Sequence, residues 1–451
     1  MQYESESGDI LLALTGETLI SRALKPFREP EYLALRDLLH SADVRFTNAE
    51  VLFHNYEDSP AYRPGGTYMR CDPRYIEDLL WLGINMVCTA NNHSFDFGEA
   101  GVLTNRRYLD QYGMAHAGTG ANMSEASAPM YMDTPKGRVA LIAATTFGML
   151  SSRAGEQRRD FKGRPGCNLI RSEPYWVVDR ETFDALKLVA SKLGWSDKTP
   201  GQGSEGFWTG QTDQVLLFDR GRYGGELPFA RFVLGKACER HFALDERDLE
   251  RNVRSVGDAA RMADWVLFTF HTNEGGKTHA EPSDHAIALA HAVIDAGAHV
   301  VIGHGSHQDR GMEIYKKRPI FYSLGDFMLQ NDTVERMPQD NMVRWNLGWD
   351  STPADFYDAR SKNETGGMMM ERFRWESVVP FVRFGGKELA EIKLYAVDLG
   401  FRRPRSQRGR PVLASGDVAR SALQRLKERS QPLGTDVQIN GDTASVILAT
   451  D

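Results

Sequence analysis

Short, uninterrupted apolar runs that end at a glycine or a polar residue constrain the fold of this chain more than any other feature. The run ILLALTG at residues 10–16 is typical of a strand buried on both faces of a sheet. Similar runs predict strands at 44–48, 84–89, 139–144, 265–270, 299–303 and 319–325. Helix-like segments lie among them at 31–40, 73–82, 101–112, 247–263 and 283–296. This alternation predicts βαβ units and therefore an α/β protein.

The pattern changes between residues 151 and 250, where charged, glycine-rich and aromatic-containing sequence replaces the apolar rhythm. We interpret 151–250 as an insertion, so that residues 1–150 and 251–400 form one discontinuous domain. Residues 401–451 are predicted to be a basic C-terminal extension, with a helix near 415–429 and a hairpin turning at Asn440-Gly441. This extension opens with Arg402, Arg403, Arg405, Arg408 and Arg410.

The charge and the termini exclude several classes of protein. A formal net charge of -7, from 54 basic and 61 acidic residues, gives no global attraction to nucleic acid. The N-terminus is acidic before its first apolar run, unlike a signal peptide, and no stretch reaches the ~20 apolar residues that span a bilayer. The scattered Cys71, Cys88, Cys167 and Cys238 suggest neither a disulfide framework nor a thiolate zinc site. We expect a cytoplasmic protein with no nucleic-acid or membrane partner.

Polar clusters stand where predicted strands end, and the carboxyl ends of strands are where sites assemble in α/β folds. The clusters are Thr15-Gly16-Glu17, Thr47-Asn48-Ala49-Glu50, Ala90-Asn91-Asn92-His93 with Asp96, His271-Thr272-Asn273-Glu274, and Gly303-His304-Gly305-Ser306-His307. Imidazole and carboxylate groups are usual ligands of zinc, manganese and iron, and no cluster contains a thiolate. Together the clusters predict a site for one or two divalent metal ions.

Each cluster taken alone has a simpler explanation. Glu17 or Glu50 could cap a helix, Asn91-Asn92-His93 could form a turn, and the glycine before His304 could merely end a strand. All of these explanations would have to hold at once for the site to be absent. The joint interpretation as a metal site is therefore the better one.

Longer segments around these clusters resemble the CapA (poly-γ-glutamate capsule biosynthesis) family, which belongs to the calcineurin-like metallophosphatase superfamily. One segment runs from Leu79 through Asn91-Asn92-His93-Ser94-Phe95-Asp96 to Gly98. The others are residues 296–307, which contain His304-Gly305-Ser306-His307, and residues 320–327. The resemblance covers about 10–145 and 255–330. It implies a two-sheet β-sandwich flanked by helices, with metals held at the strand ends.

The resemblance also implies roles for individual residues. The metal ligands by position are Glu17, Glu50, Asn92, His271, His304 and His307. His93 would be the acid or transition-state stabiliser, and we group Asp96 with it as catalytic. The candidates for substrate binding are Asn91, Glu274 and Arg164. Arg164 lies in a basic segment that could steer a carboxylate-rich or phosphorylated substrate, or could be a solvated surface loop.

Three departures from the family pattern are present. Glu17 stands where an Asp is usual, Thr272-Asn273 replaces a usual Trp-Gly, and Asp326 replaces a usual Asn. The longer side chain of Glu17 could weaken one metal position, and Asp326 adds a charge near the site. The number of metals therefore stays open.

The family resemblance and the predicted metal ligands together indicate a hydrolase. A bound metal lowers the pKa of water and polarises a scissile carbonyl or phosphoryl oxygen. We expect a metal-dependent hydrolase of amide bonds in γ-glutamyl polymer or small peptide and amide substrates, with Mn, Zn or Fe as cofactor. A phosphoesterase and a non-enzymatic subunit of capsule polyglutamate biosynthesis are the alternatives. The partner is expected to be a small or oligomeric anionic substrate, and no oligomeric state is predicted.

Overall fold

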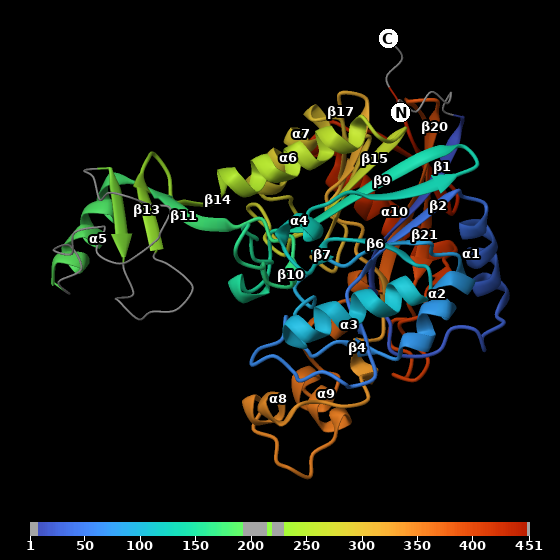
Figure 1. Ribbon diagram of the computed structural model, residues 1–451, viewed down its shortest axis with the longest axis horizontal. Helices are drawn as coiled ribbons and strands as arrows, with labels where there is room; N and C mark the ends of the chain where they lie inside the picture. Colours follow the sequence, from blue (N-terminus) through green and yellow to red (C-terminus); the bar gives the residue numbers. More distant parts are fainter. Residues whose placement is uncertain (1–7, 193–213, 219–229, 449–451) are drawn as a thin grey trace.

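Two β-sheets form the body of the protein in the computed structural model, which describes residues 8–192, 214–218 and 230–448 (Figure 1). Within these residues the larger sheet has the order β23-β24-β21-β20-β1-β2-β5-β6, with β19 paired to β1 and β22 paired to β21. Its strands are β1 (Ile10–Leu19), β2 (Val44–Ala49), β5 (Met86–Cys88), β6 (Ala115–Ala117), β19 (Asp326–Leu329), β20 (Glu376–Gly385), β21 (Glu388–Asp398), β22 (Val412–Leu413), β23 (Val437–Asn440) and β24 (Thr443–Val446). The second sheet has the order β17-β18-β16-β15-β9-β8. Its strands are β8 (Met130–Thr134), β9 (Gly137–Thr145), β15 (Trp265–His271), β16 (Val300–His304), β17 (Met312–Tyr315) and β18 (Arg318–Phe321).

Alternate residues of the central strands enter different cores. Leu12 and Leu14 of β1 lie with Leu141 of β9 in the core between the sheets. Ala13, between Leu12 and Leu14, belongs to the core on the outer face of the large sheet. Ile142, which follows Leu141, belongs to the core on the outer face of the second sheet. Successive side chains of a strand point to opposite faces, so a strand covered on both faces must be apolar throughout. This explains the uninterrupted apolar runs.

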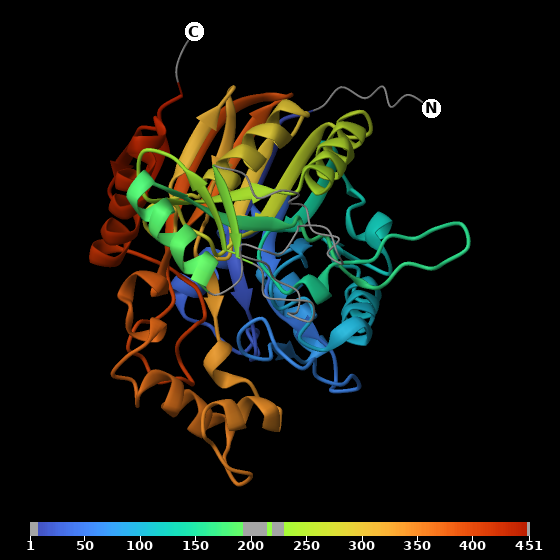
Figure 2. The same cartoon turned by 90° about the vertical axis from the view of Figure 1, so that its left-hand side faces the viewer.

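Helices cover the outer faces of the sandwich (Figures 1 and 2). Leu35 and Leu79 pack against the large sheet, whereas Val256 and Leu289 pack against the second sheet. The helices of the body include α1 (Pro30–His40), α2 (Ile76–Leu82), α3 (Gly98–Gln111), α4 (Met123–Ala126), α6 (Glu246–Ala260) and α7 (Asp284–Asp295). The predicted two-sheet α/β sandwich flanked by helices is confirmed.

A separate sheet projects from the body at the left of Figure 1. It has the order β12-β13-β11-β14 and is accompanied by α5 (Arg180–Lys192). Its strands are β11 (Ser172–Val178), β12 (Val215–Phe218), β13 (Ala230–Leu234) and β14 (Glu239–Leu244). The predicted insertion at 151–250 is wider than this sheet, because β10 (Gly166–Cys167) pairs with β7 (Thr119–Gly120) and Leu169 packs in the core between the main sheets.

The segment predicted to be a C-terminal extension packs against the body, and the expected helix near 415–429 and the hairpin turning at Asn440-Gly441 are both present. Leu423 and Leu426 of α10 (Gly416–Ser430) enter the core between the sheets, and β23 and β24 lengthen the large sheet. Two arginines of the basic run are buried and paired: Arg408 lies 2.6 Å from Asp332, and Arg410 lies 2.6 Å from Glu29. Apolar burial and internal ion pairs therefore fix this segment.

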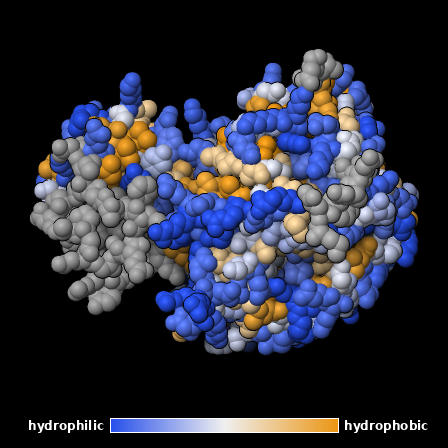
Figure 3. Space-filling view, turned by 45° about the horizontal axis from the view of Figure 1, so that its top comes forward, coloured by the Kyte–Doolittle hydropathy of each residue, from blue (hydrophilic) through white to orange (hydrophobic). Residues whose placement is uncertain are grey.

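A small helical lobe follows β19 at the bottom of Figure 1 and includes α8 (Gln339–Arg344) and α9 (Pro353–Ser361). The surface seen in Figure 3 is mostly hydrophilic, with small groups of hydrophobic side chains over both the main body and the projecting sheet. In the part of the chain that the structure describes, no helix has the length and apolar character needed to cross a bilayer.

The segment predicted as one strand at 319–325 instead changes sheets. β18 ends at Phe321 in the second sheet, and β19 begins at Asp326 beside β1 of the large sheet. The backbone N–H of Glu17 donates to the carbonyl of Gly325 over 2.9 Å. A Cβ added to Gly16 would overlap this carbonyl oxygen, so glycine is required for the two backbones to approach. The crossing places Asp326 directly opposite Glu17 in the sheet register.

We predict that Gly16→Ala destabilises the protein by about 1–3 kcal/mol or more, because the added methyl group meets backbone atoms that cannot move aside easily. The measurement is urea unfolding followed by circular dichroism. Gly257→Ala is the matched control, since Gly257 lies inside α6 and the nearest atom to an added Cβ is the carbonyl oxygen of Ala296, at 4.0 Å; this change should stabilise by about 0.5–1 kcal/mol. Equal unfolding midpoints for Gly16→Ala and the wild type would contradict the close approach.

Candidate metal centre

The carboxyl ends of neighbouring strands bring the predicted ligands to one edge of the sandwich. Glu17 lies in β1, opposite Asn48 of β2 and Asp326 of β19. His271 and His304 end β15 and β16 and are register partners across those parallel strands. A hydrogen bond from the Gly305 N–H to the Glu17 carboxylate joins the two sheets at this edge.

Glu50 lies at the centre of the cluster and is completely buried. Three imidazole nitrogens, Nε2 of His93, His271 and His307, each lie 3.9 Å from its Oε1. Neither carboxylate oxygen of Glu50 has a hydrogen-bond partner among the described residues. A buried carboxylate is costly unless it is paired or coordinates a metal, so this arrangement fits a cation held between Glu50 and the imidazoles.

A second group adjoins the first and shares His307 with it. Ligand atoms of Glu17, His307 and Asp326 all lie within 4.8 Å of one another. His307 Nδ1 is 2.8 Å from Asp326 Oδ1, while Glu17 Oε2 and Asp326 Oδ2 are buried without a partner in the described chain. The oxygen and nitrogen donors of this group also fit a divalent cation. This second group is therefore a candidate cation position that adjoins the first.

The pKa values reflect carboxylates crowded together away from water. Burial, followed by repulsion from Asp326, raises the pKa of Glu17 to about 8, and burial also raises the pKa of Glu50. Burial lowers the pKa of His307, but Asp326 and Glu50 outweigh it and the pKa rises to about 10. Burial holds the pKa of His271 far below its usual range. The excess of carboxylates over cations is the electrostatic condition that a metal ion relieves.

His93 is oriented by Asp96. The imidazole Nδ1 lies 2.7 Å from Asp96 Oδ2, and the opposite nitrogen faces Glu50. Asp96 also accepts hydrogen bonds from the backbone N–H groups of Gly65, over 2.8 Å, and Met69, over 2.7 Å. Asp96 is therefore held from three directions and positions His93.

The two asparagines before His93 make different contacts. Asn91 donates to Asn48 Oδ1 and to the carbonyl of Ala49, and it accepts from the His93 N–H. Its buried amide is thus fully used inside the protein, with no polar atom free for the substrate contact expected of it. Asn92 donates to the Gly65 carbonyl, whereas its Oδ1 is buried without a partner in the described residues. A carbonyl oxygen in this state suits the predicted ligand role.

His304 contacts His271 on the side of the ring that is opposite Glu50. Its Nδ1 lies 3.0 Å from His271 Nδ1, and its Nε2 lies 2.8 Å from the hydroxyl of Thr269. Both ring nitrogens of His304 therefore have neighbours other than Glu50. In this arrangement His304 supports the His271 ring, which presents its Nε2 to Glu50.

Two of the residues expected to bind substrate make contacts outside this cluster. The carboxylate of Glu274 accepts from the hydroxyl of Thr272, and its backbone carbonyl accepts from Arg310. Arg164 is exposed, and its guanidinium donates to the carbonyl of Arg153 over 2.9 Å. Their roles toward a substrate stay predictions.

Sequence reasoning noted Asp326 only as an added charge and missed it as a ligand candidate. The signal was present, because Gly325-Asp326 follows an apolar run just as Gly16-Glu17 does. Reasoning from sequence also missed Arg374, in the turn Arg372–Trp375. Its Nη1 donates to the carbonyls of Ser306, over 3.1 Å, and His307, over 3.4 Å. His307 has a φ of 55°, which a non-glycine residue adopts only when its surroundings hold it there.

The fold and the site define an α/β sandwich protein whose imidazole and carboxylate groups gather at the strand ends as a candidate site for divalent cations. The family model of the bacterial capsule synthesis protein PGA_cap matches residues 6–331. The chain belongs to this family, and the predicted resemblance to CapA proteins is confirmed.

Known proteins resemble the chain over different lengths. The uncharacterized protein y4uA of Sinorhizobium fredii (strain NBRC 101917 / NGR234) is 33% identical over 447 residues, which cover 95% of this chain and 91% of that protein. The PGA biosynthesis protein CapA of Bacillus subtilis (strain 168) is 30% identical over 118 residues, or 25% of this chain and 30% of that protein. The structure of Haemophilus influenzae NAD nucleotidase (NadN) aligns with 94% of this chain and 56% of that chain, with 11% identity and a TM-score of 0.33.

The contacts of His304 and His307 differ, so we predict that replacing each histidine removes a different amount of metal. His307→Ala removes a ring that lies close to the carboxylates of both Glu50 and Asp326, so we expect this change to abolish most of the metal binding. His304→Ala removes a supporting ring, and we expect metal affinity to fall by about 10- to 100-fold. Metal content after gel filtration, measured by mass spectrometry, tests this order. Full stoichiometry in His307→Ala would contradict the site.

Arg374→Gln is expected to weaken metal binding by about 10- to 100-fold, because the backbone of His307 loses the donor that holds its left-handed conformation. Arg372→Gln is the matched control: it lies in the same turn, but its described ion pair is with Glu376. Competition with a fluorescent chelator measures both affinities. Equal affinities of the two variants would show that Arg374 does not position His307.

Proposed function

We propose that this protein is a metal-dependent hydrolase of amide bonds in γ-glutamyl polymer or small peptide and amide substrates. The observation that carries the metal is the buried, unpartnered carboxylate of Glu50 with three imidazole nitrogens 3.9 Å from it. Membership in a capsule synthesis family supports the γ-glutamyl substrate class. Mn, Zn or Fe suits the mixed nitrogen and oxygen donors.

The residues that would hold the metal are Glu17, Glu50, Asn92, His271, His307 and Asp326, with His304 in support. A bound metal supplies an activated water at neutral pH and polarises the scissile carbonyl. His93 directs its Nε2 toward the same space, while Asp96 holds the opposite nitrogen and fixes the ring. A ring fixed in this way can deliver a proton to the leaving amine.

Phosphoester hydrolysis is the second candidate, because the same donor set can activate water against a phosphoryl group. The test begins with metal analysis of the purified protein. The loaded protein is then assayed with γ-glutamyl peptides and with phosphomonoesters and phosphodiesters under the metal found. Cleavage of γ-glutamyl amides supports the first function. Turnover of phosphoesters alone would replace it with the second, and inactivity on both by a metal-loaded protein would favour a non-enzymatic subunit of capsule polyglutamate biosynthesis.

His93→Ala separates proton transfer from metal binding. We expect kcat to fall by about 10²- to 10⁴-fold while metal content is unchanged, because a proton donor faces the leaving group. A substrate with a very good leaving group should be affected less. His93 Nε2 lies as far from Glu50 as the corresponding atoms of His271 and His307, so metal content and kcat are measured on the same preparation. Metal lost in parallel with activity would make His93 a ligand.

A further inference from the structure

A cavity of about 250 Å³ lies between the helical lobe and the segment that follows β21. Its wall includes Trp345, Tyr357, Arg360, Met368, Arg405 and Arg408. Most of this wall is apolar, and three guanidinium groups supply its positive charge. Binding sites for small molecules are typically concave, mostly apolar and fitted with a few polar groups that fix the ligand. The cavity has this composition.

The charges of two of these arginines are neutralised by neighbours. Arg408 lies 2.6 Å from Asp332 and 2.9 Å from Glu364, and Arg405 lies 2.7 Å from Asp358. These ion pairs tie the segment after β21 to the helical lobe. Arg405 and Arg408 therefore act as structural parts of the wall.

Arg360 differs from these neighbours. It is half-buried, and no carboxylate among the described residues lies within ion-pair distance of it. Its hydrogen-bond partners are the hydroxyl of Thr67, at 2.5 Å, and the sulfur of Met368, at 3.7 Å. Burial lowers the pKa of Arg360, with only Tyr357 opposing it. A guanidinium in an apolar wall without a counter-ion is suited to receive an anionic group from a ligand.

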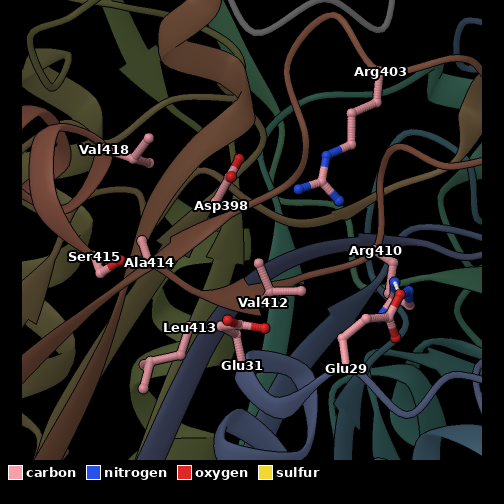
Figure 4. Close-up of a pocket in the computed structure, with 10 residues that line it drawn as sticks. All are labelled: Glu29, Glu31, Asp398, Arg403, Arg410, Val412, Leu413, Ala414, Ser415 and Val418. Carbon is pink, nitrogen blue, oxygen red and sulfur yellow. Dashed lines mark hydrogen bonds and ion pairs between the residues drawn. The ribbon is translucent and has the colours of Figure 1, made fainter.

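The cavity in Figure 4, of about 260 Å³, provides a contrast. There the guanidinium of Arg410 points to the carboxylate of Glu29, at 2.6 Å, and lies over the rings of Phe27 and Tyr32. The charge of Arg410 is thus neutralised by Glu29, and the faces of its guanidinium are covered by aromatic rings of the protein. Arg403 of the same cavity has no ion pair among the described residues, but it is exposed, and the wall also holds the carboxylates of Glu31 and Asp398. Arg360 is half-buried in a mostly apolar wall, so its cavity is the better candidate.

Contacts of Arg360 also connect the cavity to His93. Thr67, which accepts from Arg360, follows two glycines that pack on the motif containing His93. A Cβ on Gly66 would lie 3.5 Å from the His93 imidazole, and the Gly65 carbonyl accepts from Asn92. The other side of the cavity includes Asp332, in the segment directly after β19, which begins at Asp326. A ligand group bound by Arg360 would therefore adjoin the loop that covers His93.

We propose that this cavity binds the carboxylate of a small organic acid, with Arg360 as the recognition residue. The planar guanidinium matches a carboxylate with two parallel hydrogen bonds. The apolar wall formed by Trp345 and Met368 accommodates a short aliphatic stem. A free inorganic anion would leave this wall without contacts, so a carboxylate on a stem fits better than phosphate. The assignment rests on the cavity and is independent of the reaction at the metal centre.

The test is isothermal titration calorimetry with glutarate as the probe, on the full chain after treatment with a chelator so that the probe has no metal to coordinate. Arg360→Gln should weaken glutarate binding by about 10- to 150-fold, the range for hydrogen bonds to a charged group. Arg360→Lys should retain part of the affinity. Arg420→Gln is the control, because Arg420 is exposed and paired with Asp417; its affinity should equal that of the wild type.

A second variant, Met368→Trp, narrows the cavity while Arg360 remains, and it should also weaken glutarate binding. Thermal melts of all variants show whether they are folded. Unchanged affinity in both Arg360→Gln and Met368→Trp would overturn the proposal, as would a wild type that binds no glutarate. Inorganic phosphate, titrated in parallel, should bind more weakly than glutarate. Tighter binding of phosphate would overturn the carboxylate assignment.

Discussion

The carboxylate of Glu50 is the interaction on which the rest of the structure depends. It is completely buried and has no hydrogen-bond partner in the described chain, yet imidazoles from three separate segments turn a nitrogen toward it. Such a group either takes up a proton or pairs with a cation, and the imidazoles that surround it supply the ligands a metal cation needs. The imidazoles gather around Glu50 because β1 and β2 of one sheet end beside β15 and β16 of the other. The hydrogen bond from Gly305 to Glu17 joins the sheets at that edge.

The sequence was sufficient to predict the sandwich and much of the site. Runs such as 10–14 and 139–144 are apolar at every position because both faces of their strands are covered, and this pattern can be recognised without a structure. The polar residues that follow these runs converge because parallel strands end at the same edge. Asp326 also follows such a run, but its position beside Glu17 could not be predicted from the run alone. It depends on the chain leaving the second sheet after Phe321 and joining the first, a change of sheet that an apolar run does not reveal.

Other features depend on long-range contacts that no local pattern contains. The basic run at 402–410 looks like a solvated tail, but Arg408 and Arg410 are buried against acidic partners far away in the sequence. Arg374 contacts the backbone of the histidine motif from beyond residue 331, where the match to the family model ends. Arg360 also lies beyond that point. The segments after residue 331 thus contribute groups that contact the backbone of the candidate metal ligand His307 and line the cavity around Arg360.

The central claim is that a divalent cation binds between Glu50 and the imidazoles at the strand ends. Anomalous X-ray diffraction from crystals grown with Mn²⁺ tests it most directly, because the ion scatters anomalously and its position is then observed. We expect an anomalous peak within coordination distance of Glu50, His271 and His307. A map with no peak there, from crystals whose protein is shown to be folded and saturated with Mn²⁺, would contradict it.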